Sequence, residues 1–232
     1  MSTLTKALTD VATAAFFRTA TVAAVDELGP TFRRVELAGD GLRGAKWAPG
    51  HKVQLRMGDG LTLRTYTPLH WDAEAGTTAI VAFLHDSGPG SRRLATLSAG
   101  DEVRLFGPRG STALADARGP ATFVGDETSV GLAVNRHDLG DGTTWLLEAT
   151  DPDGYRRVLA GLGIEADVVP AGDDLLRDRV VTALRAAPED RLILTGRAQT
   201  IAPLRAAIKA EAIGDRPTTV KAYWDTKRAG LD

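Results

Sequence analysis

The chain has 232 residues, a length that fits one large domain or two small ones. It is 43% hydrophobic and 25% charged, with a net charge of −2, so its charge balance does not suggest a nucleic-acid partner. It contains no cysteine, which excludes disulfides, a thiol nucleophile and a cysteine-ligated iron–sulfur cluster within this sequence.

The histidines and the apolar runs narrow the class of protein further. The four histidines are far apart and lack metal-ligand spacing, so we expect no bound metal. No apolar run reaches the length of a membrane span. Residues 1–17 carry one lysine and lack the apolar core of a signal peptide, so we expect a cytoplasmic protein.

The first half of the chain predicts an antiparallel barrel. Residues 2–15 have apolar residues at helical spacing and predict a short terminal helix. After them, six segments alternate apolar and polar residues and are separated by Gly/Pro turns, a pattern typical of a small Greek-key barrel. The predicted strands are 16–25, 32–37, 52–57, 61–69, 78–84 and 102–106, with one short helix at 91–97.

From about Pro120 the pattern changes to alternating strands and helices. Such alternation predicts a parallel sheet with helices on both faces. We therefore expect two domains, a β-barrel over residues 1–116 and an α/β domain over residues 117–232. The expected strands are 121–124, 144–147, 166–169, 192–194 and 218–222, and the helices are 128–135, 155–162, 175–186 and 201–213.

The barrel half contains residues suited to a nucleotide. The helix opening at Ser91 leaves backbone N–H groups unpaired and carries a positive partial charge, which suits a phosphate. Arg64, on the strand before it, can pair with the same phosphate. Tyr66 adds a flat apolar face and Thr67 a hydroxyl, so this region predicts a nucleotide with an aromatic head group.

At these residues the chain resembles the siderophore-interacting, FAD-binding proteins of the ferredoxin reductase superfamily. The similar motifs follow one another from about Arg18 to Trp224, nearly the whole chain. They are Arg64-Thr65-Tyr66-Thr67, His85 with Gly88-Pro89-Gly90-Ser91-Arg92, Gly107-Pro108-Arg109-Gly110, Gly125-Asp126-Glu127-Thr128 and Ala222-Tyr223-Trp224.

The resemblance implies a set of site residues. For FAD binding it implies Arg64, Thr65, Tyr66, Thr67, Leu84, His85, Gly88, Gly90, Ser91, Arg92, Gly125 and Thr128. Close to the flavin ring it places Thr67, Asp126, Glu127, Tyr223 and Trp224, the last two as an aromatic shield. None of these acts as an acid or base, because electron transfer needs neither. The candidates for attracting a ferric chelate are Lys52, Arg56, His70 and Arg109.

Three positions depart from the family pattern. Relatives usually carry an arginine just after Tyr-Thr, where this chain has Pro68, Leu69 and His70, which weakens the case for a cationic grip on a siderophore. Arg197 stands where relatives have a glutamate, and Asp225 where they have an arginine, so the nicotinamide side is altered. A Gly-x-Gly-x-x-Gly motif is absent. Arg156 and Arg157, which follow the strand-end Glu148, could hold a 2′-phosphate, but the favoured interpretation of each is a helix arginine without a ligand.

We expect an FAD-dependent ferric-siderophore reductase that takes electrons from NAD(P)H and releases Fe(II). Siderophores bind ferric iron through hard oxygen donors, so reduction weakens the complex. Two alternatives remain: a flavoprotein that takes electrons from a separate ferredoxin, and a non-enzymatic siderophore-binding protein in which flavin is structural.

Overall fold

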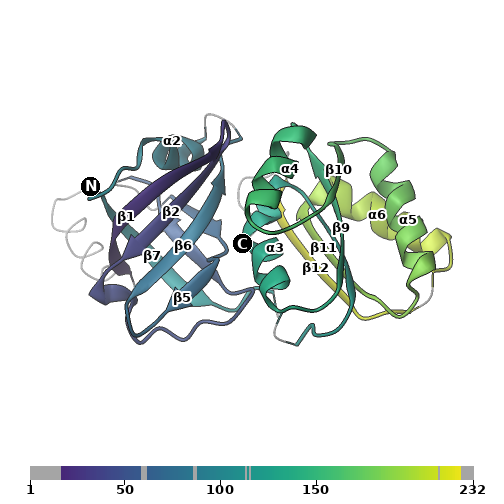
Figure 1. The fold of residues 1–232 in the computed structure, drawn as a ribbon, viewed down its shortest axis with the longest axis horizontal. Coiled ribbons are helices and arrows are strands. Elements are labelled where there is room, and N and C mark those ends of the chain that lie inside the picture. The colour runs from purple at the N-terminus through teal and green to yellow at the C-terminus, as the bar shows by residue number, and fades with distance from the viewer. Residues whose placement is uncertain are drawn as a thin grey trace, which may run out of the picture. The chain divides into compact units, whose positions relative to one another are not determined.

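The computed structural model describes residues 17–58, 62–85, 88–112, 114, 116–213 and 215–225. These residues form two compact units (Figure 1): residues 17–27 with 33–111, and residues 28–32 with 112–225. The helix expected at 2–15 lies outside the described residues. Within the described part of the chain, no helix is both long and apolar enough to cross a membrane.

The first unit is a seven-stranded sheet in the order β4-β3-β7-β1-β2-β6-β5, and the strand pairs whose register is known are antiparallel. A short turn, η1 (Asp40–Leu42), and one helix, α2 (Pro89–Thr96), accompany it. The strands are β1 (Arg18–Gly29), β2 (Phe32–Ala38), β3 (Lys52–Arg56), β4 (Leu63–Tyr66), β5 (His70–Asp72), β6 (Thr77–Phe83) and β7 (Glu102–Arg109).

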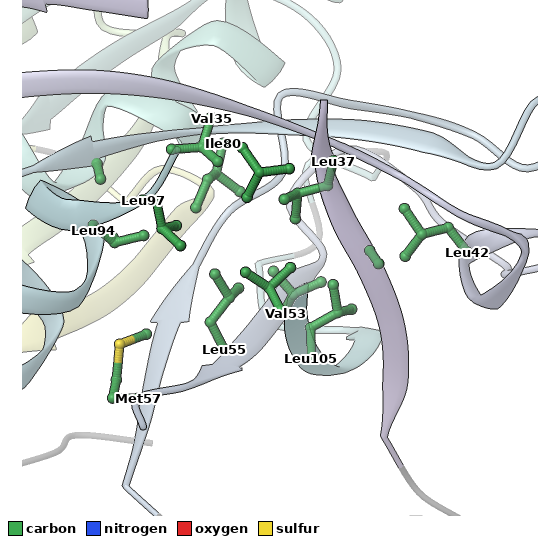
Figure 2. Packing of buried hydrophobic residues seen from close by; sticks show 14 residues of the cluster. Val35, Leu37, Leu42, Val53, Leu55, Met57, Ile80, Leu94, Leu97 and Leu105 are labelled. Atoms are coloured by element: carbon green, nitrogen blue, oxygen red, sulfur yellow. The ribbon is translucent and has the colours of Figure 1, made fainter. Parts of the chain in front are cut away.

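The sheet curls around one apolar core. Tyr66 of β4 and Trp71 of β5, from the two ends of the strand order, both pack on the same buried cluster. Leu94 and Leu97, in and just after α2, belong to that cluster together with strand residues such as Val35 and Leu105 (Figure 2). The apolar positions of each strand therefore face a shared interior, as the alternating pattern predicts.

The strand count differs from the six predicted, although the barrel class is confirmed. The segment predicted as one strand at 61–69 ends at Tyr66, because Pro68 has no N–H to continue a ladder. The chain then turns, the Leu69 N–H donates to the carbonyl of Ala79 (2.8 Å), and β5 pairs with β6 as a seventh strand. Helix α2 begins at Pro89, two residues before the predicted start, since proline suits the first helical turn.

The second unit is a five-stranded parallel sheet in the order β10-β9-β8-β11-β12, which confirms the predicted α/β class. Helices α3 and α4 lie on one face and α5 and α6 on the other (Figure 1). The strands are β8 (Ala121–Gly125), β9 (Thr143–Ala149), β10 (Asp167–Pro170), β11 (Arg191–Arg197) and β12 (Thr218–Trp224), and the helices are η2 (Glu127–Ser129), α3 (Val130–Asp138), α4 (Pro152–Gly161), α5 (Leu175–Ala186) and α6 (Ala198–Ala210).

The strand order of this sheet locates its ligand-binding edge. The chain moves outward from β8 through β9 to β10, then returns to the other side of β8 with β11 and β12. In open α/β sheets, ligands bind outside the carboxyl ends of the strands where the order reverses. The loops that follow β8 and β11 are therefore the part of this unit to examine for a site.

Candidate functional site

In the first unit, β4 and the start of α2 meet at Gly90. A Cβ atom on Gly90 would lie 3.1 Å from Cγ of Arg64 and 3.2 Å from the hydroxyl oxygen of Tyr66. Any side chain larger than that of glycine would have to displace these groups. The sequence-predicted residues Arg64, Tyr66 and Gly90 are thus brought together, although they come from two separate motifs.

The two charges that the described residues place at this meeting point, on Arg64 and at the start of α2, are both positive. Helix α2 has no side-chain cap and no acidic residue in its first turn, so its N-terminal positive partial charge is not offset there. Arg64 donates from Nη1 to the carbonyl of Leu63 (2.8 Å) and forms no ion pair with a carboxylate of the described residues. A half-buried cation beside a helix N-terminus is suited to an anion, and the pyrophosphate of FAD fits this arrangement.

Tyr66 supplies the apolar part of the same region. Its ring packs against the barrel core while its hydroxyl faces Gly90. Burial raises the pKa of the Tyr66 phenol above its ordinary value, and the nearby Arg64 acts more weakly in the opposite direction. The side chain therefore stays neutral at physiological pH and can offer a flat face to an aromatic ligand.

The other predicted cofactor residues surround this point with differing exposure. Thr65 pairs with Gln54 of β3, and Thr67 follows the end of β4. Leu84 packs on the core, whereas His85 is exposed with its ring 5.7 Å from that of Phe83. On α2 and its cap, Ser91 is buried, Gly88 is the cap residue, and Arg92 is exposed.

The four candidates for chelate binding do not form one cluster of exposed cations. Lys52 is buried (7% exposed) and stands opposite Arg109 on β7. Arg109 donates to the amide oxygen of Gln54 (2.5 Å) and lies over the ring of Phe106. Arg56 is half-buried at the end of β3, and the exposed His70 begins β5.

In the second unit, the loop after β8 is organised by Asp126, which is 2% exposed. Its Oδ1 accepts from the backbone N–H (2.9 Å) and hydroxyl (2.5 Å) of Thr128, so that Asp126 caps the N-terminus of η2. Its Oδ2 accepts from the indole Nε1 of Trp224 (2.8 Å), on the last strand. The predicted Gly125–Thr128 loop and Trp224 therefore meet through one carboxyl group.

Close packing on every side confines this carboxyl group. Gly196 has φ of +97°, and a Cβ there would lie 2.6 Å from Cγ of Asp126. The hydroxyl of Tyr155 donates to the Asp126 carbonyl (3.1 Å), and Oε1 of the neighbouring Glu127 accepts from the N–H of Thr150 (2.6 Å). Burial raises the pKa of Asp126 to about 6 despite the hydrogen bonds from Thr128 and Trp224, and Glu127 adds to the rise.

Sequence analysis gave no role to another buried carboxylate at this edge, besides those of Asp126 and Glu127. Glu148, near the end of β9, is 2% exposed and accepts from Nη2 of Arg197 at 3.0 and 3.1 Å. It also accepts from the hydroxyl of Thr200 and from the N–H of Gly172 (3.0 Å). Its position in the sequence could have revealed it. Glu148 lies about twenty residues after the loop that follows β8, which is where dinucleotide-binding folds carry the acid that binds a ribose.

Arg197 and Asp225, which depart from the family pattern, each have a partner within the second unit. Arg197 pairs with Glu148, and its guanidinium carbon lies 5.9 Å from the ring centre of Trp224. Asp225 accepts from the amide nitrogen of Gln199 (2.7 Å), and Tyr223 is half-buried on β12.

Arg156 and Arg157, the two arginines considered for a 2′-phosphate, both lie on α4. Arg156 pairs with Asp153 and donates to the carbonyl of Val168 (2.6 Å), so it joins α4 to β10. Arg157 is exposed on α4.

Comparisons with known proteins agree with this architecture. Residues 54–112 match the family model of the siderophore-interacting FAD-binding domain. No curated protein matches the sequence.

Similar solved structures share the fold over most of the chain. A siderophore utilization protein from T. fusca is 24% identical, covers 93% of this chain and 95% of its own, and has a TM-score of 0.74. The siderophore-interacting protein SipS from Aeromonas hydrophila is 18% identical (92% and 93% covered, TM-score 0.73). A phthalate dioxygenase reductase is 16% identical (90% and 69% covered, TM-score 0.71). The family-model match and these neighbours confirm the resemblance to siderophore-interacting proteins and the ferredoxin reductase-like fold.

Proposed function

We propose that this protein is an FAD-dependent reductase of ferric siderophores that takes its electrons from NAD(P)H. The match of residues 54–112 to a siderophore-interacting FAD-binding domain supports the cofactor and the substrate class. The similar proteins from T. fusca and Aeromonas hydrophila, described as a siderophore utilization and a siderophore-interacting protein, support the same reading. The likeness to a phthalate dioxygenase reductase supports electron transfer as the type of reaction.

The observation that carries the proposal is Arg64 beside the start of α2. Among the described residues neither Arg64 nor the first turn of α2 has an acid to offset its positive charge. Gly90 keeps the backbone open beside the Arg64 and Tyr66 side chains. In this proposal Arg64 and the N–H groups of α2 hold the pyrophosphate, and Tyr66 packs on the flavin part of the cofactor.

The reaction links a donor of electron pairs to an acceptor of single electrons. Bound FAD supplies that exchange between two-electron and one-electron chemistry. One nicotinamide reduces two ferric ions, and each loses affinity for the hard oxygen donors of its siderophore on becoming ferrous. The protein's part is to bind the cofactor, leave one face open and attract the chelate.

One observation favours a second donor, a reduced ferredoxin. Glu148 lies where a dinucleotide-binding fold holds a ribose, and here its oxygens already accept from Arg197, Thr200 and Gly172. A nicotinamide dinucleotide would have to bind beside this network or open it. A ferredoxin could deliver electrons without binding at Glu148 or opening this network.

The cofactor is tested first, with protein purified under gentle conditions. We expect a yellow protein that releases FAD, and not FMN, on acid treatment and chromatography, because the α2 start requires a second phosphate. FMN alone, or no flavin and no binding of added FAD, would contradict the proposal.

The reaction is tested next by photoreducing the flavoprotein and mixing it anaerobically with a ferric chelate in a stopped-flow instrument. Flavin reoxidation together with Fe(II) formation identifies a reductase. Tight chelate binding without reoxidation identifies a binding protein. NADPH, NADH and reduced ferredoxin, compared side by side, then identify the donor.

A further inference from the structure

Asp126 divides its two carboxylate oxygens between two distant segments. Oδ1 accepts from the N–H and hydroxyl of Thr128 and so caps the turn after β8. Oδ2 accepts from the indole Nε1 of Trp224, 98 residues further along the chain (2.8 Å). One carboxyl group therefore joins the first loop of the parallel sheet to the end of its last strand.

The surroundings leave this carboxyl group little room to turn. Gly196 approaches so closely that a Cβ there would lie 2.6 Å from the Asp126 Cγ. Tyr155 holds the Asp126 backbone carbonyl from α4, and the Ser129 hydroxyl accepts from the Asp126 N–H (3.3 Å). With its backbone and carboxyl group both held, Asp126 can fix the indole of Trp224, which donates to its Oδ2.

The charged and titratable groups around Asp126 come from several elements. Glu127 beside it is a buried acid, and Tyr155 from α4 is a buried phenol. Arg197, whose guanidinium carbon lies 5.9 Å from the centre of the Trp224 ring, is paired with Glu148, and Asp225 accepts a hydrogen bond from Gln199. Among the described residues no cation pairs with Asp126, so hydrogen bonds alone hold its ionised form.

We propose that Asp126 is the positioning residue for Trp224, which it holds in place while ionised and releases when its Oδ2 is protonated. Oδ2 is the oxygen that takes the proton, because Oδ1 already accepts from the N–H and hydroxyl of Thr128 and from the hydroxyl of Ser129 (3.5 Å). An O–H at Oδ2 faces the indole N–H, and two donors cannot bond to each other. In the reductase proposed above, and resting on that proposal, this bond sets how readily Trp224 moves away from the carboxyl-end edge of the parallel sheet, where a nicotinamide dinucleotide would bind.

The position of the titration supports a role near neutral pH. Burial raises the pKa of Asp126 to about 6, against an ordinary value of 3.8. The carboxyl group then changes charge within the range that cells experience, whereas an exposed aspartate is ionised throughout it.

Two substitutions separate the indole bond from the cap. Asp126→Asn keeps one oxygen, and asparagine is a good cap, so the amide oxygen stays on Thr128 and the NH₂ group faces the indole. Trp224→Phe keeps an aromatic ring and removes only the donor. Trp71 serves as an internal control, because its indole donates to the carbonyl of Leu42 (3.1 Å), which does not titrate.

The test is an NMR titration of the ¹⁵N-labelled indole groups of the purified protein. The Trp224 resonance, assigned by its loss in Trp224→Phe, should shift with an apparent pKa near 6, while that of Trp71 stays constant. In Asp126→Asn the Trp224 resonance should sit at the low-pH position and not titrate. A Trp224 resonance that is flat with pH in the parent, or that titrates unchanged in Asp126→Asn, would overturn the proposal.

The link to function has its own readout in anaerobic flavin reduction by NADPH. Asp126→Asn and Trp224→Phe should both be faster than the parent at pH 7.5, on the order of tenfold for the loss of one charge-assisted hydrogen bond. The parent should approach their rate near pH 5. If the indole titrates but all rates are equal, the gating step is overturned while the positioning role stands. If no variant binds flavin, the proposed function fails and the NMR result is unaffected.

Discussion

Two arginines show how a charge in a partly buried place can be balanced in different ways. Arg64 has no carboxylate partner among the described residues, while Arg197 is bound by Glu148 within its own unit. A charge away from water is stable only when it is paired or hydrogen-bonded. Arg64 donates one hydrogen bond, to the Leu63 carbonyl, and in the proposed function an external anion balances its charge, whereas the charge of Arg197 is already paired inside the protein.

Replacing Arg64 with alanine should weaken FAD binding about ten- to a hundredfold and leave the fold intact. The reason is that a hydrogen bond to a charged group contributes roughly 1.5–3 kcal/mol. Flavin retention is measured by equilibrium dialysis, together with circular dichroism. The matched control is Arg104→Ala, an exposed barrel arginine paired with Glu102, which should bind FAD like the parent. Equal affinity in both variants would contradict the phosphate role of Arg64.

A double variant of Glu148 and Arg197 should lose less stability than the sum of the losses in the two single variants. Glu148→Gln or Arg197→Met leaves a largely buried partner without its counter-charge, at a cost of roughly 2–3 kcal/mol, while the double variant removes both charges. Urea unfolding of the four proteins gives the coupling energy. The surface pair Arg185–Glu211, with side chains 60% and 45% exposed, should show a coupling below about 1 kcal/mol. Additive effects at Glu148 and Arg197 would show that the pair is not energetically coupled.

At the scale of elements, the end of β11 is shaped by the loop after β8. Gly196 adopts φ of +97° at an irregularity in the pairing of β11 with β12, and Asp126 fills the space that a side chain would need. This glycine is required both for its backbone conformation and for the close approach of the carboxyl group. The conformations of the loop after β8 and of the end of β11 therefore both require glycine at position 196.

Gly196→Ala should therefore lower stability and disturb Trp224. The left-handed conformation costs roughly 1–2 kcal/mol for a residue with a side chain, and the Cβ displaces the Asp126 carboxyl group. Thermal unfolding measures the first effect, and the Trp224 indole resonance measures the second. Gly140→Ala is the control, since Gly140 also has positive φ (71°) but no atom within 4 Å of a Cβ there. An unshifted Trp224 resonance in Gly196→Ala would refute the coupling between the two loops.

At the scale of the whole molecule, the free energy of unfolding depends on how each buried ionisable group is paired. Arg136, with a fully buried side chain, donates to the carbonyls of Ala117 and Gly119 and so fixes the segment that leads into β8. Burial lowers the pKa of Arg136, and the nearby Asp141 opposes that effect. Asp126 is different, because no cation of the described residues offsets its burial.

The Asp126 carboxyl group should make the protein less stable as pH rises from about 4 to about 6. Its folded pKa lies above the ordinary value of 3.8, so between the two values the folded state holds the proton that the unfolded state has lost. The stability it contributes is full below pH 4 and is lost as pH rises through 6. The rise from 3.8 to about 6 corresponds to roughly 3 kcal/mol.

The measurement is the difference in free energy of unfolding between the parent and Asp126→Asn, followed from pH 4 to pH 7.5. Other carboxyl groups titrate in both proteins and cancel in the difference. The parent should lose stability relative to the variant as pH rises. A difference that does not change with pH would show that Asp126 titrates normally.

Much of the architecture followed from local patterns. The alternation of period two in the first half, and of strand and helix in the second, predicted a barrel and a parallel-sheet unit because side-chain burial imposes those periods. Arg64 and the Gly88–Ser91 turn were predicted to bind phosphate because arginine and a helix start are both chemically suited to it, and the structure brings Arg64 close to Gly90. The seventh strand, β5, was missed because three residues are too short to show a period.

Only the tertiary structure decided which distant residues meet. Glu148 and Arg197 are 49 residues apart, and Asp126 and Trp224 are 98 apart. Their contacts depend on the strand order of the parallel sheet, which brings the ends of β8, β9, β11 and β12 to one edge. The sequence by itself determined the types of element, since these follow from local patterns, while phosphate binding by Arg64 and the start of α2 stays a prediction. The pairing of buried charges at the sheet edge was decided by topology, because only packing determines which strand ends become neighbours.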